Sequence, residues 1–373
     1  MNVAEKIHED ALSLHGVLTS AGGGPANSPI TIRQKFETVR WSWASRILGE
    51  QAIFLDKDCA SGPAVGDLAL VRVTGIGEHE RIVTHDNKRL RIYADDLIVG
   101  VFGNRYATDA FEGEVAGVHD LSVLTAGGMI GTVRSGHRNM SRPTTVSFIG
   151  YLAGPDGARI NLKRSGFRRR VTGRPPACPV IAVVGTAMNS GKTTASVKLA
   201  KALCNSGLRV ASCKLTGSVS NRDQDEMRSA APCSVLDFSD YGFPSTYLCD
   251  TQELLDLFQT MLADLENAQP QIVVMEIADG ILQRETAMLL RNPTFRQGLR
   301  GVILSADNAL SALYAAGQLK DLGHHVIAVS GAMTSSPLSI REFQDRSDIP
   351  VARSSGSGEE LAETVSKFAG LRS

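Results

Sequence analysis

Two patterns of hydrophobic and polar positions divide the chain. Between residues 66 and 154, short segments alternate apolar and polar residues and are broken by glycines, as in GDLALVRVTGIGEHERIV (66–83) and DLSVLTAGGMIGTVRS (120–135). Short alternating strands at close spacing are typical of an antiparallel barrel or sandwich. We therefore predict a β-rich domain over residues 31–165, which begins with a short helix in RQKFETVRWSWASRIL (33–48).

The pattern changes at residue 179, where continuous apolar runs begin to alternate with amphipathic helices. PVIAVVGT (179–186) and PQIVVMEIADG (270–280) are typical of buried strands, and residues 192–207 and 252–268 have the apolar spacing of helices. Buried strands that alternate with helices indicate an α/β fold with a doubly wound, mostly parallel sheet. We predict that this domain occupies residues 179–373.

Two segments lie outside these domains. Residues 1–30 contain AGGGPANSP and are expected to be flexible. Residues 166–178 are expected to form a linker, within the basic and proline-rich run KRSGFRRRVTGRPPACP (163–179). The basic residues of 163–174 could contact the phosphates of a nucleic acid, although a solvated connector is the favoured interpretation.

Composition narrows the class of protein. The chain has 373 residues, of which 43% are hydrophobic and 21% charged, and its formal net charge is zero. These values are typical of a globular protein and do not indicate a globally basic nucleic-acid binder. The six cysteines form no CxxC pair, and no apolar stretch approaches the roughly 20 residues that span a bilayer. We therefore expect a cytoplasmic protein with no membrane partner.

GTAMNSGKTT (185–194) has the form of a phosphate-binding loop. It follows an apolar strand and precedes a helix, which is the context that such a loop requires. Backbone N–H groups of the loop and the helix dipole would face the phosphates. The residues expected to contact a nucleotide are Gly185, Thr186, Asn189, Ser190, Gly191, Lys192, Thr193 and Thr194. Among these, Lys192 would reach the β- and γ-phosphates, and the hydroxyl of Thr193 would bind Mg²⁺.

The loop is one residue longer than the common pattern, since five residues lie between Gly185 and Gly191. In this it resembles the loop of dethiobiotin synthetase and its relatives, which reads Gly-Thr-Asp-Thr-x-Val-Gly-Lys-Thr. The wider class includes cobyrinate synthetases of the amidotransferase type and the accessory protein of molybdopterin-guanine-dinucleotide synthesis. Ala187 and Met188 depart from the family loop. Thr186 replaces the early lysine of the MinD-type ATPases, which argues against that branch.

The resemblance implies further site residues downstream. It implies a substrate-side lysine at the end of the second strand, where VASCKLTGS places Lys214. It also implies an acidic Mg²⁺ ligand soon afterwards, for which Asp223 and Asp225 are both candidates. A glutamate at the end of a later conserved strand would complete the metal shell, and IVVMEIADG supplies Glu276 there, with Asp279 close behind. Carboxylates at strand ends are the hard oxygen ligands that Mg²⁺ prefers.

Three more candidates follow from position alone. Ser330 and Gly331 follow the last apolar strand, where they would line a nucleotide base. Asp307 and Asn308 follow another strand and would contact base or substrate. The polar-aromatic turn FGNRYATDAFEGE carries Asn104, Arg105, Tyr106 and Asp109 as a candidate ligand or interface site.

The phosphate loop and the resemblance to dethiobiotin synthetase together imply an ATP-dependent small-molecule kinase or ligase that uses Mg²⁺, with GTP as the other candidate nucleotide. Lys192, Lys214 and Glu276 are the expected catalytic residues, and Lys214 would orient an anionic substrate. Two alternatives stay open, namely a nucleotide-switched partner-binding NTPase and a nucleic-acid 5′-end kinase. A homodimer is a further alternative to a monomer.

Overall fold

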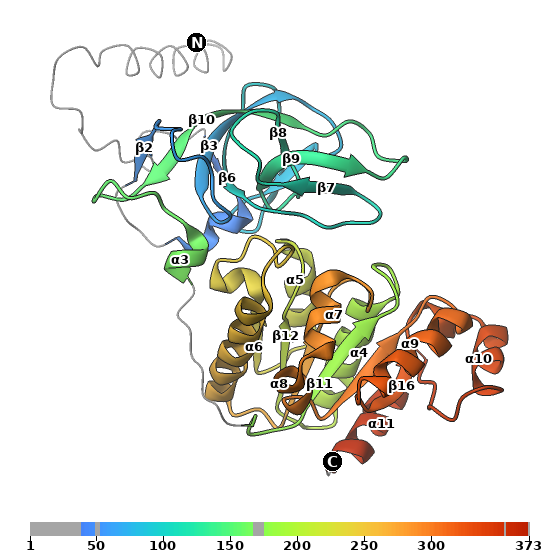
Figure 1. Ribbon diagram of the computed structural model, residues 1–373. Coiled ribbons are helices and arrows are strands. Elements are labelled where there is room, and N and C mark those ends of the chain that lie inside the picture. Colours follow the sequence, from blue (N-terminus) through green and yellow to red (C-terminus); the bar gives the residue numbers. More distant parts are fainter. Residues whose placement is uncertain (1–38, 49–52, 167–174, 354–355, 372–373) are drawn as a thin grey trace, which may run out of the picture.

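The computed structural model describes residues 39–48, 53–166, 175–353 and 356–371. The segment expected to be flexible, 1–30, lies outside these ranges, as does most of the basic linker. Strands β1–β10, apart from the separate β4–β5 hairpin, form one sheet, and strands β11–β16 form another. We call residues 39–166 the N-terminal module and residues 175–371 the C-terminal module; Figure 1 shows them one above the other.

The N-terminal module consists almost entirely of short strands. Its elements are β1 (Val39–Trp41), η1 (Trp43–Ile47), β2 (Phe54–Asp56), β3 (Leu68–Gly75), β4 (Arg81–Val83), β5 (Arg89–Arg91), β6 (Leu97–Phe102), β7 (Phe111–Glu114), β8 (Leu121–Val123), β9 (Met129–Gly136), β10 (Thr145–Ala153) and the single-turn helix α3 (Leu162–Gly166).

Pairing closes the middle of this sheet into a small barrel. The strands follow the order β6-β3-β10-β8-β9, and β9 pairs again with β6. Alternate residues of each strand then face the barrel interior or its outer side. On β3, for example, Val71 and Val73 belong to one buried cluster, whereas Leu68 and Leu70 belong to another. The alternating sequence pattern therefore fits a barrel, which is one of the two architectures expected for the β-rich domain.

The short helix predicted over residues 33–48 is wrong for the part that the structure describes. Residues 39–41 form strand β1, which pairs with β6 in parallel, and only residues 43–47 turn into a 3-10 helix. The Val-Arg-Trp sequence of β1 explains the difference, because β-branched and aromatic residues favour a strand when a partner edge is available.

The C-terminal module is a parallel sheet with helices, which confirms the α/β prediction. Its strands are β11 (Val180–Gly185), β12 (Val210–Lys214), β13 (Ser234–Asp237), β14 (Ile272–Glu276), β15 (Gly301–Ser305) and β16 (Val326–Ser330). Its helices are α4 (Lys192–Asn205), α5 (Arg222–Ser229), η2 (Phe238–Tyr241), α6 (Thr251–Leu265), η3 (Glu266–Ala268), α7 (Arg284–Arg291), α8 (Pro293–Gln297), α9 (Ala309–Asp321), η4 (Ala332–Ser335), α10 (Pro337–Gln344) and α11 (Glu359–Ala369).

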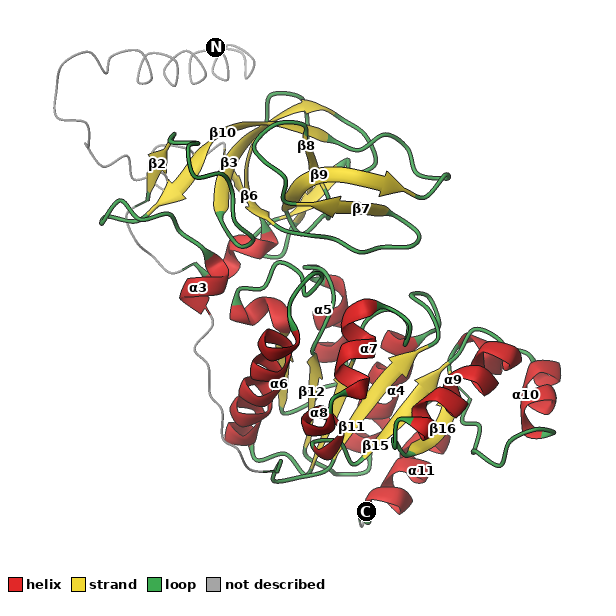
Figure 2. Cartoon of the chain, in the orientation of Figure 1, coloured by secondary structure: helices red, strands yellow, loops and turns green. Residues whose placement is uncertain are grey.

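Strand β11 lies inside this sheet, which has the order β13-β12-β14-β11-β15-β16 with every pair parallel. Ala182 and Val184 of β11 pack in the cluster that contains α6 and α9, whereas Ile181 and Val183 pack in the cluster that contains α4 and α11. Helices therefore cover both faces, and Figure 2 shows the strands between them. β14 and β15 lie on opposite sides of β11, so the chain crosses over β11 on its way from β14 to β15. Where the strand order changes direction in this way, a crevice opens at the carboxyl ends of the strands, here at the end of β11.

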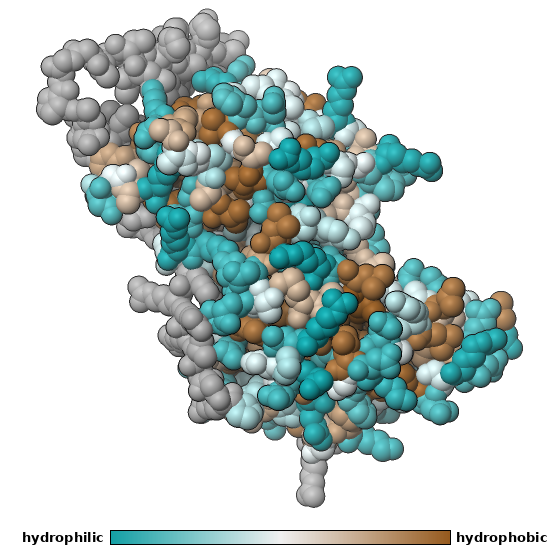
Figure 3. All heavy atoms as spheres, viewed as in Figure 1, coloured by the Kyte–Doolittle hydropathy of each residue, from teal (hydrophilic) through white to brown (hydrophobic). Residues whose placement is uncertain are grey.

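Exposed hydrophobic side chains gather on one side of the C-terminal module. Leu310, Tyr314 and Leu338 of α9 and α10 are 78%, 55% and 63% exposed. Hydrophobic residues are also visible over these helices in Figure 3. A homodimer, which the sequence leaves open as an alternative to a monomer, would find an apolar contact on this surface. Across the described ranges, no helix combines the length and the apolar character needed to cross a membrane.

The two modules are joined by packing and by hydrogen bonds. Val219, in the loop after β12, is fully buried in the hydrophobic cluster of the N-terminal module. Arg46 of η1 donates to Ser239 Oγ at 3.0 Å and pairs with Asp240 of η2. Asn87 Nδ2 donates to Asp225 Oδ2 of α5 at 3.0 Å. Because these contacts come from segments that follow the carboxyl ends of β12 and β13, they hold the barrel over the crevice.

Val219→Ala is expected to destabilise the protein by about 1–2 kcal/mol, because it removes buried apolar atoms from the module junction. Urea unfolding followed by circular dichroism measures the change. Leu310→Ala is the matched control, since its 78% exposed side chain contributes little burial. An unchanged unfolding midpoint for Val219→Ala would mean that this loop does not couple the modules.

Candidate active site

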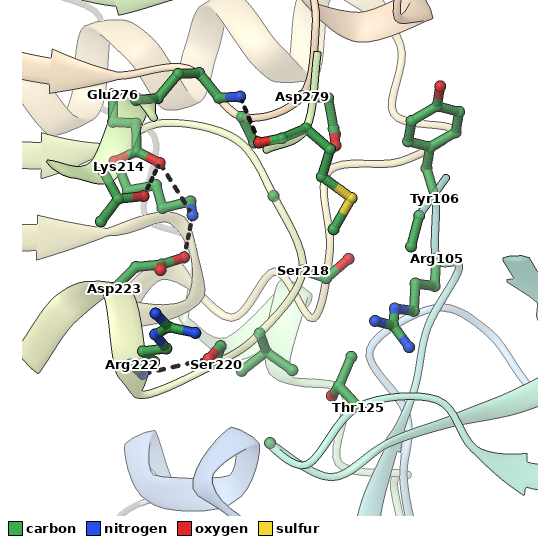
Figure 4. A pocket seen from close by; sticks show the side chains of 18 of the residues that line it. Arg105, Tyr106, Thr125, Lys214, Ser218, Ser220, Arg222, Asp223, Glu276 and Asp279 are labelled. Atoms are coloured by element: carbon green, nitrogen blue, oxygen red, sulfur yellow. Dashed lines mark hydrogen bonds and ion pairs between the residues drawn. The ribbon is translucent and has the colours of Figure 1, made fainter. Parts of the chain in front are cut away.

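A cavity of about 410 Å³ lies between the phosphate loop and the barrel. The C-terminal module contributes the loop and the strand-end residues, including Lys192, Lys214 and Glu276. The N-terminal module contributes residues of two loops, 105–107 and 125–127, together with His79. Figure 4 shows Arg105 and Tyr106 on one wall, with Lys214, Asp223 and Glu276 on the other. Neither module encloses this space alone.

The phosphate loop has the backbone that its sequence predicts. β11 ends at Gly185, and α4 begins at Lys192. A Cβ on Gly185 would lie 2.4 Å from Ser190 Oγ, so a larger residue would have to displace the side chains of Ser190 and Lys192. Gly191 has a φ of 96° and packs against Gly331, which requires glycine. Strand, loop and helix thus follow one another in the order that a phosphate-binding loop requires.

The side chain of Lys192 lies back over its own loop. Its Nζ donates to the carbonyl oxygens of Ala187 at 2.7 Å and Met188 at 3.0 Å. Burial lowers the pKa of Lys192 to about 8, against the opposing effect of Glu276 and Asp279. The ammonium therefore lies beside the loop interior, within reach of any anion that the loop amides bind.

Glu276 joins three parts of the site. It ends β14, is 1% exposed, and accepts a hydrogen bond from Thr193 Oγ1 at 3.1 Å. Lys214 Nζ lies 3.3 Å from the same Oε1 and also pairs with Asp223. Burial lowers the pKa of Lys214, but Glu276 and Asp223 more than offset this and raise it above its ordinary value. Lys214 is thus already neutralised by two carboxylates, so its expected role as a cation for the substrate is not supported.

The site fits a magnesium ion that arrives with a nucleotide. Glu276 Oε2 is buried and has no hydrogen-bond partner within the described residues, and it lies beside the hydroxyl of Thr193. Among the residues that the structure describes, no group of three or more His, Cys, Asp or Glu side chains could hold a metal by itself. Mg²⁺ is usually held by one or two carboxylates together with waters and substrate phosphates. One unpaired carboxylate oxygen, without a complete set of protein ligands, therefore fits an ion that arrives with its nucleotide.

The structure separates the two aspartates that the sequence left as alternatives. Asp223, in the first turn of α5, pairs with Lys214 and lines the cavity. Asp225 instead accepts from Asn87 of the barrel and from Asn221, at 3.0 and 3.1 Å. Two residues along a helix point about 200° apart, which explains why one faces the cavity and the other the module junction. Asp225 is therefore not retained as a metal ligand.

Ser330 and Gly331 support the phosphate loop and do not line the cavity. Ser330 is fully buried at the end of β16. A Cβ on Gly331 would lie 2.3 Å from the carbonyl oxygen of Ser190, so Gly331 packs directly beneath the loop. The expected contact of these residues with a base is therefore wrong for Ser330, whose side chain has no exposed surface to offer.

The other residues of the loop are held by neighbouring elements. Thr186 Oγ1 donates to Asp307 Oδ1 at 2.7 Å, and Asn308 caps α9. Asn189 Nδ2 donates to Asp109 Oδ2 of the N-terminal module at 2.8 Å. Ser190 is buried, whereas Thr194 is exposed and lines the cavity. Asp307 and Asp109 therefore fix the two sides of the loop.

Asp279 lies between the lysines and the barrel wall. It follows β14, has a φ of 60°, and lines the cavity. Burial raises the pKa of Asp279 to about 6, against the opposing effect of Lys192 and Lys214. A carboxylate with this pKa can accept a proton near neutral pH.

The barrel wall was only partly anticipated from sequence. The turn with Arg105 and Tyr106 was a candidate, and the structure places both side chains in the cavity wall. His79 and Thr125 were missed, because nothing in their local sequence distinguishes them. Arg105 donates to the carbonyl oxygen of Leu124, and burial lowers its pKa to about 10, so the guanidinium keeps its charge. Burial and Arg105 lower the pKa of His79 to about 4, which leaves this imidazole neutral.

The basic run 163–174 is described only at its start. Lys163 pairs with Glu253 and lies 4.9 Å from the ring centre of Phe243. Residues 167–174 lie outside the described ranges, so a nucleic-acid contact through this run stays a prediction.

Comparisons with known proteins add little to this geometry. No protein-family model and no curated protein matches the chain. Among solved structures, the signal recognition particle receptor FtsY from Elizabethkingia anophelis in complex with GDP aligns with a TM-score of 0.35 and 17% identity, over 57% of this chain and 70% of that one. Chloroplast FtsY from Physcomitrella patens aligns with a TM-score of 0.34 and 13% identity, over 55% of this chain and 70% of that one.

The kinase domain of Escherichia coli tyrosine kinase ETK aligns with a TM-score of 0.30 and 13% identity, over 40% of this chain and 66% of that one. Similarity at this level assigns neither a family nor an activity, and the resemblance to dethiobiotin synthetase is not confirmed.

Asp279→Asn is expected to stabilise the protein at pH 7 by about 1–2 kcal/mol and to have little effect near pH 4. The folded-state pKa of Asp279, about 6, lies above the ordinary value of 3.8. Its contribution to stability is therefore complete below pH 3.8 and is lost as the pH rises through about 6. Asparagine also tolerates a positive φ. Urea unfolding of both proteins from pH 4 to pH 8 tests this, and a difference that does not change with pH would contradict the assignment.

Proposed function

We propose that the protein is an ATP- and Mg²⁺-dependent phosphotransferase or ligase that acts on a small anionic acceptor. The observation that carries this proposal is the shared cavity, which is lined by Lys192, Thr193 and Glu276 of one module and by Arg105 and Tyr106 of the other. The phosphate loop supports a nucleotide on one wall. The barrel supplies a separate wall with a cation, which suits an anionic acceptor.

The residues of the C-terminal wall would hold the phosphoryl donor. Loop amides and Lys192 bind the phosphates, and Lys192 exchanges its contacts with Ala187 and Met188 for phosphate oxygens. Thr193 and Glu276 would hold Mg²⁺, and Asp223 orients Glu276 through Lys214. When bound, Mg²⁺ neutralises charge on the β- and γ-phosphates and makes phosphorus more electrophilic.

The barrel wall would hold the acceptor. Arg105 binds its anionic group, and Asp279 accepts the proton if the attacking oxygen belongs to a hydroxyl group. That oxygen forms the new bond to the γ-phosphorus, the bond from phosphorus to the β–γ bridging oxygen breaks, and ADP leaves. An attacking carboxylate would give an acyl phosphate, which a ligase consumes, whereas a hydroxyl would give a phosphate ester.

A second candidate is a nucleotide-switched NTPase that binds a partner. It is favoured by the contacts between the phosphate loop and the barrel, in which Asn189 bonds to Asp109 and Met188 Sδ lies 3.9 Å from Thr108 Oγ1. Movement of this loop on nucleotide binding would reach the barrel directly. ADP release with Mg²⁺–ATP alone separates the two candidates, since a switch turns over steadily whereas a kinase or ligase needs its acceptor.

Lys192→Ala is expected to weaken Mg²⁺–ATP binding at least about tenfold, because the variant loses a charge-assisted contact to the phosphates. Calorimetric titration with ATP and then GTP measures this and shows which base is preferred. Lys201→Ala is the matched control, since Lys201 is an exposed lysine on the same helix. Equal affinities for Lys192→Ala and wild type would refute every nucleotide-dependent function of this loop.

Arg105→Gln is expected to raise the KM for the acceptor about 10–100-fold, because it removes the cation on the barrel wall. The acceptor is first found as the member of a carboxylate, phosphate-ester and alcohol panel that accelerates ADP formation. Arg138→Gln, at an exposed arginine of the same module, is the control. If Arg105→Gln and Arg138→Gln gave the same KM as wild type, the acceptor would not lie against the barrel.

A further inference from the structure

A second cavity, of about 520 Å³, adjoins the first one. Both cavities are lined by His79, Arg105 and Ala126, so these residues form the boundary between the two spaces. The second cavity lies wholly within the N-terminal module and also contains Arg81 and Arg89 of the β4–β5 hairpin. None of these residues beyond Arg105 belongs to the phosphate chemistry described above.

The acidic residues of the second cavity are already bonded to protein groups. Glu78 accepts from Ser141 Oγ at 2.6 Å, and Glu80 pairs with Arg91 at 3.2 Å. Asp109 accepts from Asn189 of the phosphate loop at 2.8 Å. These carboxylates are therefore poorly placed to bind a cationic ligand.

Two arginines of the second cavity, in contrast to its carboxylates, have no such protein partners within the described ranges. Arg81 and Arg89 make no side-chain hydrogen bond or ion pair with any residue that the structure describes. In the hairpin register Arg89 is opposite Val83, which places it diagonally across from Arg81 on the same face. Diagonal neighbours lie about 7–8 Å apart, so two long guanidinium groups can converge on one anion. Nε of Arg105 is likewise buried without a partner among the described residues.

The hairpin is also fixed relative to the other module. Asn87, in the turn between β4 and β5, donates to Asp225 and accepts from Asn221 Nδ2 at 2.8 Å. The two free arginines are thereby held at a defined distance from the phosphate loop, on the far side of His79 and Arg105.

We infer that the acceptor is an elongated molecule with a second anionic group, which binds between Arg81 and Arg89. This inference rests on the proposed function of the first cavity. The acceptor's reacting end lies near Asp279 and Lys192, its middle passes Arg105 and His79, and its distal end carries a carboxylate or a phosphate monoester. Arginine pairs bind both groups in a bidentate manner, so the two chemistries share one site.

Binding of small dianions tests the inference without knowledge of the acceptor. Glutarate (a dicarboxylate), 3-phosphonopropionate (a phosphonate with a carboxylate) and acetate are titrated calorimetrically at fixed ionic strength, with Mg²⁺ and a non-hydrolysable ATP analogue present. We expect at least one dianion to bind about tenfold or more tightly than acetate. Preference for glutarate identifies a carboxylate end, and preference for 3-phosphonopropionate identifies a phosphate end.

The double variant Arg81→Gln/Arg89→Gln is expected to reduce dianion affinity about tenfold or more. Both side chains are exposed, so the fold should tolerate the change. Arg134→Gln is the matched control, because Arg134 is an arginine of the same module that pairs with Glu114 and lines neither cavity. Equal dianion affinity in the double variant and wild type would overturn the inference, as would dianions that bind no better than acetate.

The same titrations separate this inference from the proposed function. If dianions bind through Arg81 and Arg89 but the nucleotide does not bind, the proposed function fails and the anion site stands. If the nucleotide binds but the dianions do not, only the inference fails. A single-stranded 5′-hydroxyl oligonucleotide that binds through the two arginines, while neither dianion binds, would overturn the small-molecule assignment in favour of a nucleic acid.

Discussion

The buried carboxylate of Glu276 is the constraint on which the rest of the site depends. It sits at the carboxyl end of β14 with 1% exposure, where an unpaired charge would be strongly destabilising. Lys214 from β12 and Thr193 from α4 satisfy one of its oxygens. Asp223 then balances the charge of Lys214. The same interactions that make this burial tolerable bring a threonine hydroxyl, two carboxylates and the phosphate loop into one place.

The barrel turns this half-site into an enclosed one. Its contacts with the C-terminal module involve loops that also bear site residues, so the junction and the site are built together. Val219 buries its side chain in the barrel while the neighbouring residues Ser218 and Ser220 line the cavity. Asp109 holds Asn189 of the phosphate loop. A ligand that changes the loop conformation therefore acts on both modules at once.

The sequence predicted the parallel sheet and the phosphate loop because both rest on local patterns. The five apolar residues 180–184 before Gly185 are typical of a buried strand, and the glycines at 185 and 191 stand where a Cβ would meet other atoms at close range. Prediction from the sequence failed where the place of a residue depends on the direction of its side chain or on contacts with residues far away in the chain. Asp223 and Asp225 are equivalent in a sequence, but helix geometry sends them to different neighbours. Ser330 has a suitable side chain at a strand end, yet the loop above it leaves no exposed surface. His79 and Thr125 reach the cavity only through barrel closure and module docking.

The central claim is that phosphate chemistry takes place between the modules, with Lys192 on one side and Arg105 on the other. A crystal structure with Mg²⁺ and a non-hydrolysable ATP analogue tests it most directly. The account predicts that Lys192 has left the carbonyl oxygens of Ala187 and Met188 for the phosphates, that Thr193 binds Mg²⁺, and that the γ-phosphate faces Arg105. A nucleotide whose γ-phosphate points away from the barrel, or that binds outside the loop, would contradict it.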